Sequence, residues 1–451
     1  MTESFDILVV GAGPAGIAAA VRAAEAGRSV ALLDDNPAAG GQIWRSGAHA
    51  PAHARAWLAR LESRDVLRKQ GWRVIDCPEA GVVRAERNPG QPLPGTGKGP
   101  IEQIADFRYQ RLILATGARE RFLPFPGWTL PNVMGAGGLD AMVRGGLPIG
   151  GKRVVVAGTG PLLLAVAAHL AQRGAKILAV CEQASMGRLM SFGTRMLSEP
   201  GKLWQGLGYS LAIGPMRFKT GCWPVMAHGQ DRLRAVTLRQ GAKRWVIECD
   251  YLACGFHLVP NTELAALLGC RMQDGFVATD GQMRTSVPNV FCAGEPTGIG
   301  GVDVSLLEGE IAGLAAAGRV DHARELADKR HARRGFVRAL RQACALDPQL
   351  RSLAADDTLV CRCEDVGYGR LRECSSWREA KLHTRCGMGS CQGRICGAAA
   401  EFLFGWGAES IRPPIFPARV ASLAMLPQQP ATVSGSREAA GEVSHTIKET
   451  A

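Results

Sequence analysis

The chain has 451 residues, 46% hydrophobic and 21% charged, which is typical of folded globular proteins and excludes wholesale disorder. Its net charge is +12, but no compact run of Lys and Arg carries interleaved aromatic residues, so we predict no nucleic-acid interface. No apolar run could span a bilayer and no signal peptide is recognisable, so we expect a cytoplasmic protein, free or held peripherally at the inner membrane through a partner.

The N-terminal segment is predicted to be a strand–helix–strand unit. Residues 5–10 form a short apolar strand, a glycine-rich turn follows, and an Ala-rich helix runs to about Glu25. Residues 29–33 form the second strand, and Asp34 comes directly after it. A carboxylate at this spacing from the turn can accept the ribose hydroxyls of a dinucleotide.

The turn itself, GAGPAG, predicts a phosphate-binding site. Gly11 permits the tight turn, Gly13 lets a pyrophosphate approach the backbone, and Gly16 lets helix and strand pack closely. The N-terminus of the helix adds free N–H groups and the positive end of its dipole. A glycine turn without a ligand is the alternative, and the surrounding strand, helix and acid argue against it.

Two later apolar strands are predicted, and each ends in a turn of small residues. Residues 112–114 lead into Ala115-Thr116-Gly117, and a strand within residues 285–301 ends at Ala293-Gly294-Glu295, before a helix at about 306–317. With the Gly40-Gly41-Gln42 turn, this set resembles the flavoprotein disulfide-reductase superfamily with two dinucleotide-binding domains. The resemblance implies FAD in the first domain, with Glu295 near its ribityl chain in place of the usual Asp. The implied FAD residues are Gly11, Gly13, Pro14, Ala15, Gly16, Asp34, Asp35, Gly41, Gln42, Ala115, Thr116, Gly117, Gly294 and Glu295.

A second strand–helix–strand unit begins at Val154 and reaches Glu182. In the superfamily this unit binds NAD(P)H, and Glu182 would favour NAD over NADP. Leu163 stands where the third glycine is expected. We therefore rank a vestigial site, or one for a non-redox adenine nucleotide, slightly above a working NADH site. The candidate residues are Gly158, Gly160, Pro161 and Glu182.

The sequence contains no Cys-x-x-Cys pair for disulfide reduction beside a flavin. Cys249 and Cys254 are predicted to lie in one strand, where their odd separation places them on opposite faces. Core positions are therefore expected for both, and thioredoxin-reductase chemistry is not.

Six of the 14 cysteines lie between residues 361 and 396. Cys361-x-Cys363 is followed by two short helical stretches, the second capped at Ser375-Ser376, and then by the run from Cys386 to Cys396. Zinc usually takes wider turns than Cys-x-Cys, and disulfides do not suit a reducing compartment. A [2Fe–2S] cluster fits best, with the glycines freeing N–H groups to point at its sulfides.

The segment resembles the small helical [2Fe–2S] domain of the bacterioferritin-associated-ferredoxin type. The implied ligands are Cys361, Cys363, Cys391 and Cys396. Cys386 could replace Cys391, because both are followed by a cysteine at the same spacing, but we treat it as a spare. Cys374 is expected to pack in a helix.

The predicted fold class is α/β, with two Rossmann-like domains followed by this [2Fe–2S] domain. Residues 88–100 are expected to form a surface loop. The predicted divisions are FAD domain 1–120 and 261–320, nucleotide-like domain 121–260, helical connector 321–355, [2Fe–2S] domain 356–426 and flexible tail 427–451.

This domain order and the sequence PGWTLPNV at 126–133 resemble the alpha-type (A) subunits of heteromeric flavoprotein amine dehydrogenases. Opine (octopine, nopaline) oxidases and D-hydroxyproline dehydrogenases belong there. The B subunit of hydrogen cyanide synthase and the alpha subunit of heterotetrameric sarcosine oxidase look like more distant relatives. The resemblance implies a beta subunit of the amino-acid-oxidase type that oxidises a C–N bond, while this chain relays electrons. Further candidates are an interfacial FMN and a small gamma subunit.

No local acid, base or nucleophile constellation stands out in the sequence, so no catalytic residue is predicted. Two alternatives remain open: a self-contained NADH-dependent reductase, and a binding module with a vestigial flavin site. The amine and the final electron acceptor cannot be read from the sequence.

Overall fold

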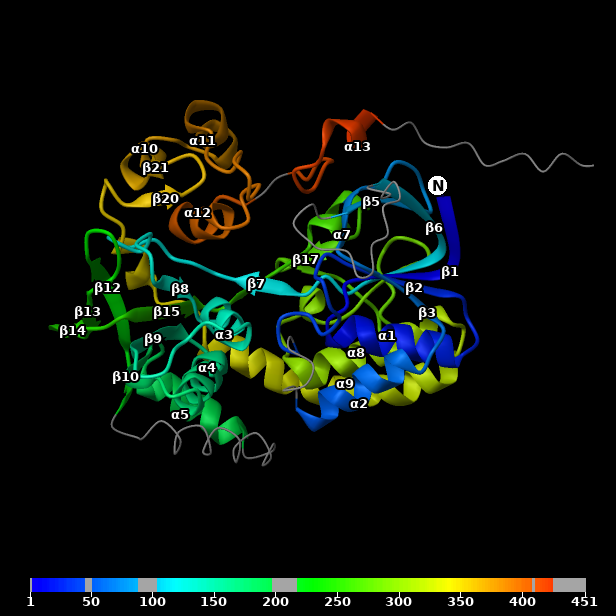
Figure 1. Cartoon of the computed structure of the whole chain (residues 1–451), viewed down its shortest axis with the longest axis horizontal. Helices are drawn as coiled ribbons and strands as arrows, with labels where there is room; N and C mark the ends of the chain where they lie inside the picture. The colour runs from blue at the N-terminus through cyan, green and yellow to red at the C-terminus, as the bar shows by residue number, and fades with distance from the viewer. Residues whose placement is uncertain (1, 45–50, 88–103, 197–216, 408–409, 425–451) are drawn as a thin grey trace, which may run out of the picture.

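The structure is a computed structural model that describes residues 2–44, 51–87, 104–196, 217–407 and 410–424 (Figure 1). The loop predicted at 88–100 and the tail predicted at 427–451 lie outside the described residues.

The first sheet carries the predicted FAD unit, and β1 pairs in parallel with both β2 and β6. Its strand order is β3-β2-β1-β6-β5-β4, with β19 added on β6. The strands are β1 (Thr2–Val10), β2 (Val30–Asp34), β3 (Val66–Gln70), β4 (Trp72–Asp76), β5 (Val82–Arg87), β6 (Ile104–Leu114) and β19 (Val290–Cys292).

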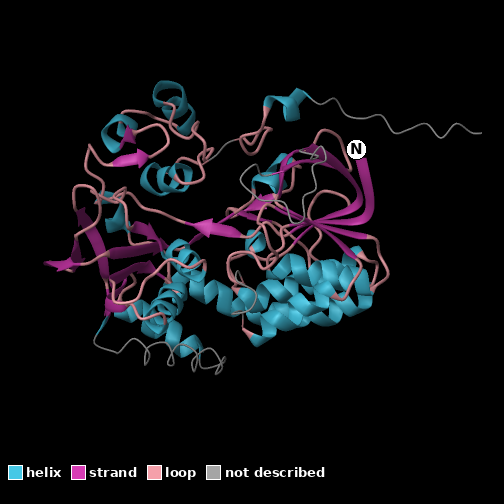
Figure 2. Ribbon diagram, viewed as in Figure 1, coloured by secondary structure: helices cyan, strands magenta, loops and turns pink. Residues whose placement is uncertain are grey.

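Helices lie together under this sheet (Figure 2). They are α1 (Pro14–Glu25), α2 (Ala52–Glu62), α8 (Val302–Ala316) and α9 (Val320–Ala343). Glycines on α8 permit its close contact with α1: a Cβ on Gly309 would lie 2.1 Å from the Ala15 oxygen, and one on Gly313 would lie 2.3 Å from the Ala19 oxygen. The small residues of α8 thus serve its packing against α1. This helix, predicted from about residue 306, begins earlier, at Val302.

The second sheet carries the predicted second unit, with strand order β11-β10-β9-β15-β8. Its strands are β8 (Val133–Gly135), β9 (Arg153–Thr159), β10 (Lys176–Glu182), β11 (Phe218–Thr220) and β15 (Tyr251–Phe256). Its helices are α3 (Ala136–Arg144), α4 (Pro161–Gln172) and α5 (Met186–Met196). A three-stranded antiparallel sheet packs beside it: β12 (Cys222–His228), β13 (Ala235–Gln240) and β14 (Lys243–Glu248).

The chain passes between the two sheets twice, through β7 (Ala118–Glu120) and β16 (Leu258–Pro260), which pair antiparallel (Figure 1). Smaller elements follow β16: α7 (Glu263–Leu267), β17 (Met272–Gln273), β18 (Phe276–Val277) and the 3₁₀ turn η3 (Glu295–Thr297). The predicted pair of Rossmann-like domains is thus confirmed, while the predicted domain boundaries stay a prediction.

The cysteine-rich segment forms a small separate core around Trp377 and Leu371. Its elements are β20 (Leu359–Cys361), β21 (Val366–Gly367), α10 (Tyr368–Arg372), α11 (Trp377–Thr384) and α12 (Cys396–Phe404). The 3₁₀ turn η4 (Pro348–Ser352) precedes this core and packs against the second sheet through Leu350, and α13 (Val420–Ala424) follows it. The predicted cap of α11 is confirmed, because the Ser376 hydroxyl accepts a hydrogen bond from the Glu379 N–H at 3.2 Å.

One strand prediction was wrong in detail. Cys249 precedes β15, which begins at Tyr251, so Cys249 and Cys254 do not share a strand. Both are nevertheless buried in the same apolar cluster, as expected of core residues.

None of the described helices combines the length and the apolar character needed to cross a membrane.

Candidate functional site

The first glycine turn leaves an open space at its centre. A Cβ on Gly11 would lie 2.2 Å from the Ala115 oxygen, and one on Gly16 would lie 1.7 Å from the Gly11 oxygen. These two glycines are therefore required by the fold. A Cβ on Gly13, in contrast, would meet no other part of the chain within 4 Å. Space next to this backbone is what a bound pyrophosphate needs.

Asp34 lies at the end of β2, against the same turn. Its carboxylate accepts hydrogen bonds from the Ala12 N–H at 2.5 Å and from the Asn36 N–H at 2.7 Å. Burial raises the pKa of Asp34, and these hydrogen bonds oppose the shift. The Asp35 carboxylate instead forms an ion pair with Arg73, with 3.3 Å between its Oδ2 and the Arg73 Nε. Asp34 is thus the better placed of the two for a ribose.

The second small turn, Gly40-Gly41-Gln42, packs onto the first. The Gly40 N–H donates to the Ala12 oxygen at 2.8 Å. A Cβ on Gly41 would lie 2.9 Å from the Cα of Gly13. Gln42 is exposed. Segments that are distant in sequence therefore meet around Gly13, as the resemblance implies.

The turn after β6, Ala115-Thr116-Gly117, is hydrogen-bonded to Asn261, a residue that belongs to none of the sequence motifs. The Thr116 hydroxyl donates to the Asn261 oxygen at 2.5 Å, and the Asn261 amide donates to the Thr116 oxygen at 2.9 Å. The Asn261 N–H also donates to the Gly117 oxygen at 3.0 Å. Because Asn261 returns the chain to the FAD sheet, it connects both segments of the predicted FAD domain.

Glu295 folds back onto the loop that precedes α8. Its carboxylate accepts from the N–H groups of Gly300, at 3.2 Å, and Gly301, at 3.0 Å. Burial raises the pKa of Glu295 to about 7. A carboxyl group that protonates near neutrality can donate as well as accept a hydrogen bond.

A buried ion pair supports the neighbouring Gly294. The Gly294 N–H donates to Glu308 at 2.9 Å, and Glu308 pairs with Arg330 of α9 at 2.6 Å. Sequence reasoning missed both residues, because a buried pair between two separately predicted helices leaves no motif. Taken together, the open space at Gly13 and its place at the N-terminus of α1 fit a bound dinucleotide.

The second glycine turn differs from the first, because a cysteine from a distant segment packs beside it. A Cβ on Gly158 would lie 1.8 Å from the Gly255 oxygen, so this glycine is needed for strand packing. A Cβ on Gly160 would lie 3.7 Å from the Cys344 sulfur. The Cys344 thiol, which also bonds to Thr159, thus stands beside the glycine that a pyrophosphate would approach. Pro161 opens α4 and is exposed.

Glu182 is engaged within the chain. It accepts from the Thr159 hydroxyl at 2.6 Å, the Gly160 N–H at 2.7 Å and the Ala184 N–H at 2.8 Å. Its side chain is 3% exposed, and burial raises its pKa. The Asp34 carboxylate of the first turn is likewise buried and held by three donors, so the contacts of Glu182 do not by themselves distinguish the two turns.

The segment that follows α9 covers this turn. The Gln183 amide donates to the Ala345 oxygen at 3.2 Å and accepts from the Asp347 N–H at 2.9 Å. Arg188 donates to the same Ala345 oxygen at 2.6 Å. The geometry therefore favours the vestigial interpretation over a working NADH site.

NADH is accordingly expected to bleach the flavin of the purified chain slowly or not at all. The physical reason is that the Cys344 sulfur packs beside Gly160, the glycine that the pyrophosphate of NADH would approach, and that Leu163 replaces the third glycine of the turn. Anaerobic absorbance spectra with NADH test this, and dithionite serves as the control that the flavin is reducible. Rapid stoichiometric bleaching by NADH would contradict the interpretation.

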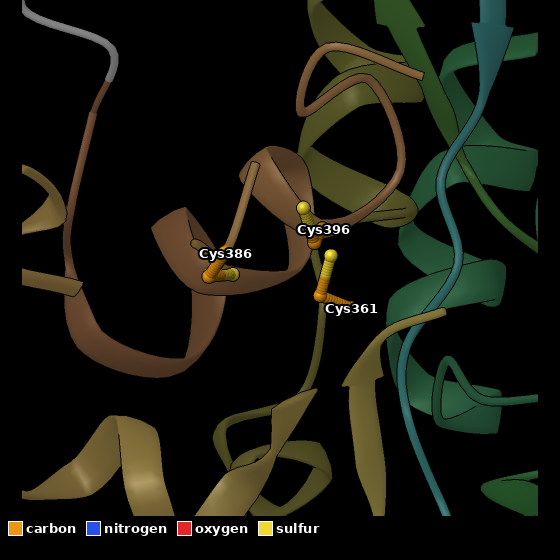
Figure 3. A group of neighbouring side chains, drawn as sticks. All are labelled: Cys361, Cys386 and Cys396. Atoms are coloured by element: carbon orange, nitrogen blue, oxygen red, sulfur yellow. The ribbon is translucent and has the colours of Figure 1, made fainter. Parts of the chain in front are cut away.

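The cysteine-rich segment brings thiols together. The sulfurs of Cys361, Cys386 and Cys396 all lie within 4.8 Å of one another, and all three residues are buried (Figure 3). Cys391 forms side-chain contacts with Cys396 and with the exposed Cys363. All four predicted ligands thus belong to one connected group, but Cys386, treated as a spare, lies inside it.

The surroundings of these thiols fit a metal cluster. Contacts with the thiols of Cys386 and Cys396 lower the pKa of Cys361, and the contact with Cys396 lowers the pKa of Cys391. Backbone N–H groups add to both shifts, including that of Gly387 toward Cys361 and that of Gly393 toward Cys391. Thiolates that accept N–H bonds are the ligands of iron–sulfur clusters.

Glycines make this packing possible. A Cβ on Gly389 would lie 2.3 Å from the Cβ of Cys363, and one on Gly387 would lie 2.5 Å from the Trp377 ring. Cys374 follows α10, donates its S–H to the Arg370 oxygen of that helix at 3.7 Å, and is no part of the thiol group that the structure describes.

Comparison with known proteins gives a consistent result. The family model described as pyridine nucleotide-disulphide oxidoreductase matches residues 5–317. The chain is 31% identical to the A-type subunit of opine oxidase from Agrobacterium tumefaciens (strain Ach5), over 95% of this chain and 93% of that protein. It is also 31% identical to hydrogen cyanide synthase subunit HcnB of Pseudomonas protegens, over 87% of this chain and 90% of that protein.

Among solved structures, L-proline dehydrogenase from P. horikoshii resembles this chain with a TM-score of 0.64. The alignment covers 94% of this chain and 81% of that one, at 16% identity. At this identity the likeness shows a shared fold, and it extends beyond the two Rossmann-like domains.

Proposed function

Because this chain belongs to the pyridine nucleotide-disulphide oxidoreductase family, and within it to the group of A-type opine oxidase subunits and HcnB-type subunits, we propose that it is an electron-relay subunit. It is a flavin-dependent oxidoreductase subunit of a heteromeric enzyme. The beta subunit of that enzyme, a flavoprotein of the amino-acid-oxidase type, oxidises the C–N bond of a secondary amine or imino acid. Octopine, nopaline and D-hydroxyproline are the candidate substrates.

The observation that carries the proposal is the pairing of two sites in one chain. The space at Gly13 can hold a dinucleotide, and the group around Cys361 offers thiolates to an iron–sulfur cluster. FAD takes up two electrons and can release them singly, while such a cluster carries one at a time. A chain that holds both converts two-electron oxidation of an amine into one-electron transfer.

Each set of residues has a distinct part in this function. Gly13 and Asp34 hold the pyrophosphate and ribose of FAD, and Glu295 places a carboxyl group beside its ribityl chain. We retain Cys361, Cys363, Cys391 and Cys396 as the proposed ligands of a [2Fe–2S] cluster. Cys386 is the alternative ligand in place of Cys391. The burial of Cys386 beside Cys361 and Cys396 supports this alternative.

The covered second glycine turn supports the relay over a self-contained NADH-dependent reductase. Electrons would then enter from the partner subunit rather than from a nucleotide bound at Gly160. An adenine nucleotide at this turn, an FMN at the subunit interface and a small gamma subunit remain further parts of the proposal. The cytoplasm, free or at the inner membrane through the complex, is the proposed location.

The isolated chain is expected to oxidise no amine, because the sequence offers no acid, base or nucleophile constellation for C–N oxidation. The purified chain should be assayed with a dye acceptor against octopine, nopaline, sarcosine, hydroxyproline and glycine. Co-expression with its beta subunit is the matched control and should restore dye reduction with one of them. Turnover by the single chain would refute the relay.

A further inference from the structure

Arg119 of β7 lies where three parts of the chain meet. Its Nε donates to the Arg394 backbone oxygen at 3.1 Å. Its Nη1 donates to the Asn261 side chain at 2.7 Å and pairs with Glu263 at 2.9 Å. One guanidinium thus joins the strand between the sheets, the chain that returns from β16 and the cysteine-rich segment.

Each of its contacts leads to one of the two proposed redox sites. Asn261 is hydrogen-bonded to the backbone of Thr116 and Gly117, in the turn predicted to face FAD. Arg394 lies between Cys391 and Cys396 in the sequence. The path from the flavin turn to the cysteine loop therefore consists of Asn261, Arg119 and the Arg394 carbonyl.

The cysteine loop is also held from its other side. The Arg394 side chain donates to the Ile415 oxygen at 2.6 Å, and its guanidinium lies 3.7 Å from the centre of the Phe416 ring. Its backbone carbonyl remains the acceptor for Arg119. The Arg119 bridge is thus the contact that links this loop directly to Asn261 and Thr116, while the Arg394 side chain holds the loop from the opposite side.

We propose that Arg119 is the positioning residue that sets the spacing between FAD and the [2Fe–2S] cluster for electron transfer within one chain. This inference rests on the proposed function. Each transfer takes one electron from the reduced flavin to the oxidised cluster, and the cluster passes that electron to an external one-electron acceptor, such as the assay dye, before it takes the second. Two such transfers return the flavin to its oxidised form, with its protons released to water. Arg119 itself is neither oxidised nor reduced. A planar guanidinium is suited to the role, because it can donate to several acceptors in fixed directions.

Arg121 provides the matched control. It lies two residues further along, on the same face of an extended chain. It donates to the Ala398 oxygen of α12 at 3.3 Å and lies 3.7 Å from Glu401. It therefore also holds the cysteine-rich segment, but its contacts lead to α12 rather than to Asn261. Arg119→Gln and Arg121→Gln each remove one positive charge. Any effect of the lost charge on the difference in reduction potential between FAD and the cluster is therefore common to both variants.

The test is flash photoreduction of the full chain, with EDTA and a deazaflavin as the electron donor. The quantity measured after the flash is the rate at which the cluster is reduced. Arg119→Gln is expected to slow this step by about 10- to 100-fold, the range found for residues that orient metal ligands. FAD content, iron content, the EPR spectrum of the reduced cluster and the unfolding temperature should match those of the wild type. Arg121→Gln should transfer electrons at close to the wild-type rate.

A wild-type rate in Arg119→Gln would overturn the inference, as would an equal slowing in both variants. If Arg119→Gln loses iron, Arg119→Lys is used, since lysine keeps a donor but cannot reach all three acceptors. It should then retain the cluster and show intermediate slowing; a wild-type rate would again refute the proposal. If the wild-type chain with both cofactors bound shows no transfer, the relay function itself fails, and the Arg119 inference fails with it.

Discussion

Replacement of Gly13 by Val is expected to yield a folded chain without flavin. The backbone at Gly13 has a φ of −75°, which any residue adopts, and a Cβ there meets no other part of the chain within 4 Å. Valine would enter only the space assigned to the pyrophosphate. The steric clash between this side chain and the pyrophosphate would cost up to about 3 kcal/mol of the free energy of FAD binding. That cost corresponds to an affinity for FAD lowered on the order of 100-fold. The ratio of flavin to protein absorbance after gel filtration measures it.

Other glycines provide the controls for this experiment. Gly281→Val introduces the same side chain at an exposed glycine of the predicted FAD domain, also with open space around it, and should keep its flavin. Gly16→Val is unsuitable, because its Cβ would lie 1.7 Å from the Gly11 oxygen and disrupt the fold. Full flavin occupancy in Gly13→Val would show that the FAD site is wrongly assigned.

Cys361→Ser and Cys396→Ser are each expected to abolish the visible absorbance of the cluster. Both cysteines belong to the predicted ligand set and to the buried trio of the structure. Serine is a poorer ligand for iron, whose clusters in proteins are held by cysteine thiolates. The wild-type chain, purified anaerobically, should contain two irons and two labile sulfides. Iron analysis and the EPR spectrum of the reduced protein measure the loss.

Three further variants complete this test. Cys374→Ser is the control and should retain the cluster, because the Cys374 thiol bonds to the Arg370 oxygen rather than to the other thiols. Retention in Cys386→Ser together with loss in Cys391→Ser supports the predicted ligands, and the reverse supports Cys386 in place of Cys391. Stoichiometric zinc in place of iron would refute the cluster assignment altogether.

The sequence by itself determined the local units of this protein. The strand–turn–helix–strand from β1 to Asp34 could be predicted because its glycine spacing, apolar period and acid all lie within one short stretch. The same holds for the unit from β9 to Glu182 and for the Ser376 cap of α11. Each depends on contacts between near neighbours in sequence, so residue type and spacing carry the information.

Only the tertiary structure decided which of these units is open to a ligand. Both glycine turns look alike in sequence, yet Gly13 faces open space while Gly160 faces Cys344, which arrives from the far end of α9. The place of Cys386 among the thiols and the bridge from Arg119 to the cysteine loop are equally non-local. Such contacts join segments that only the packing of separate elements brings together, and no spacing within either segment predicts them.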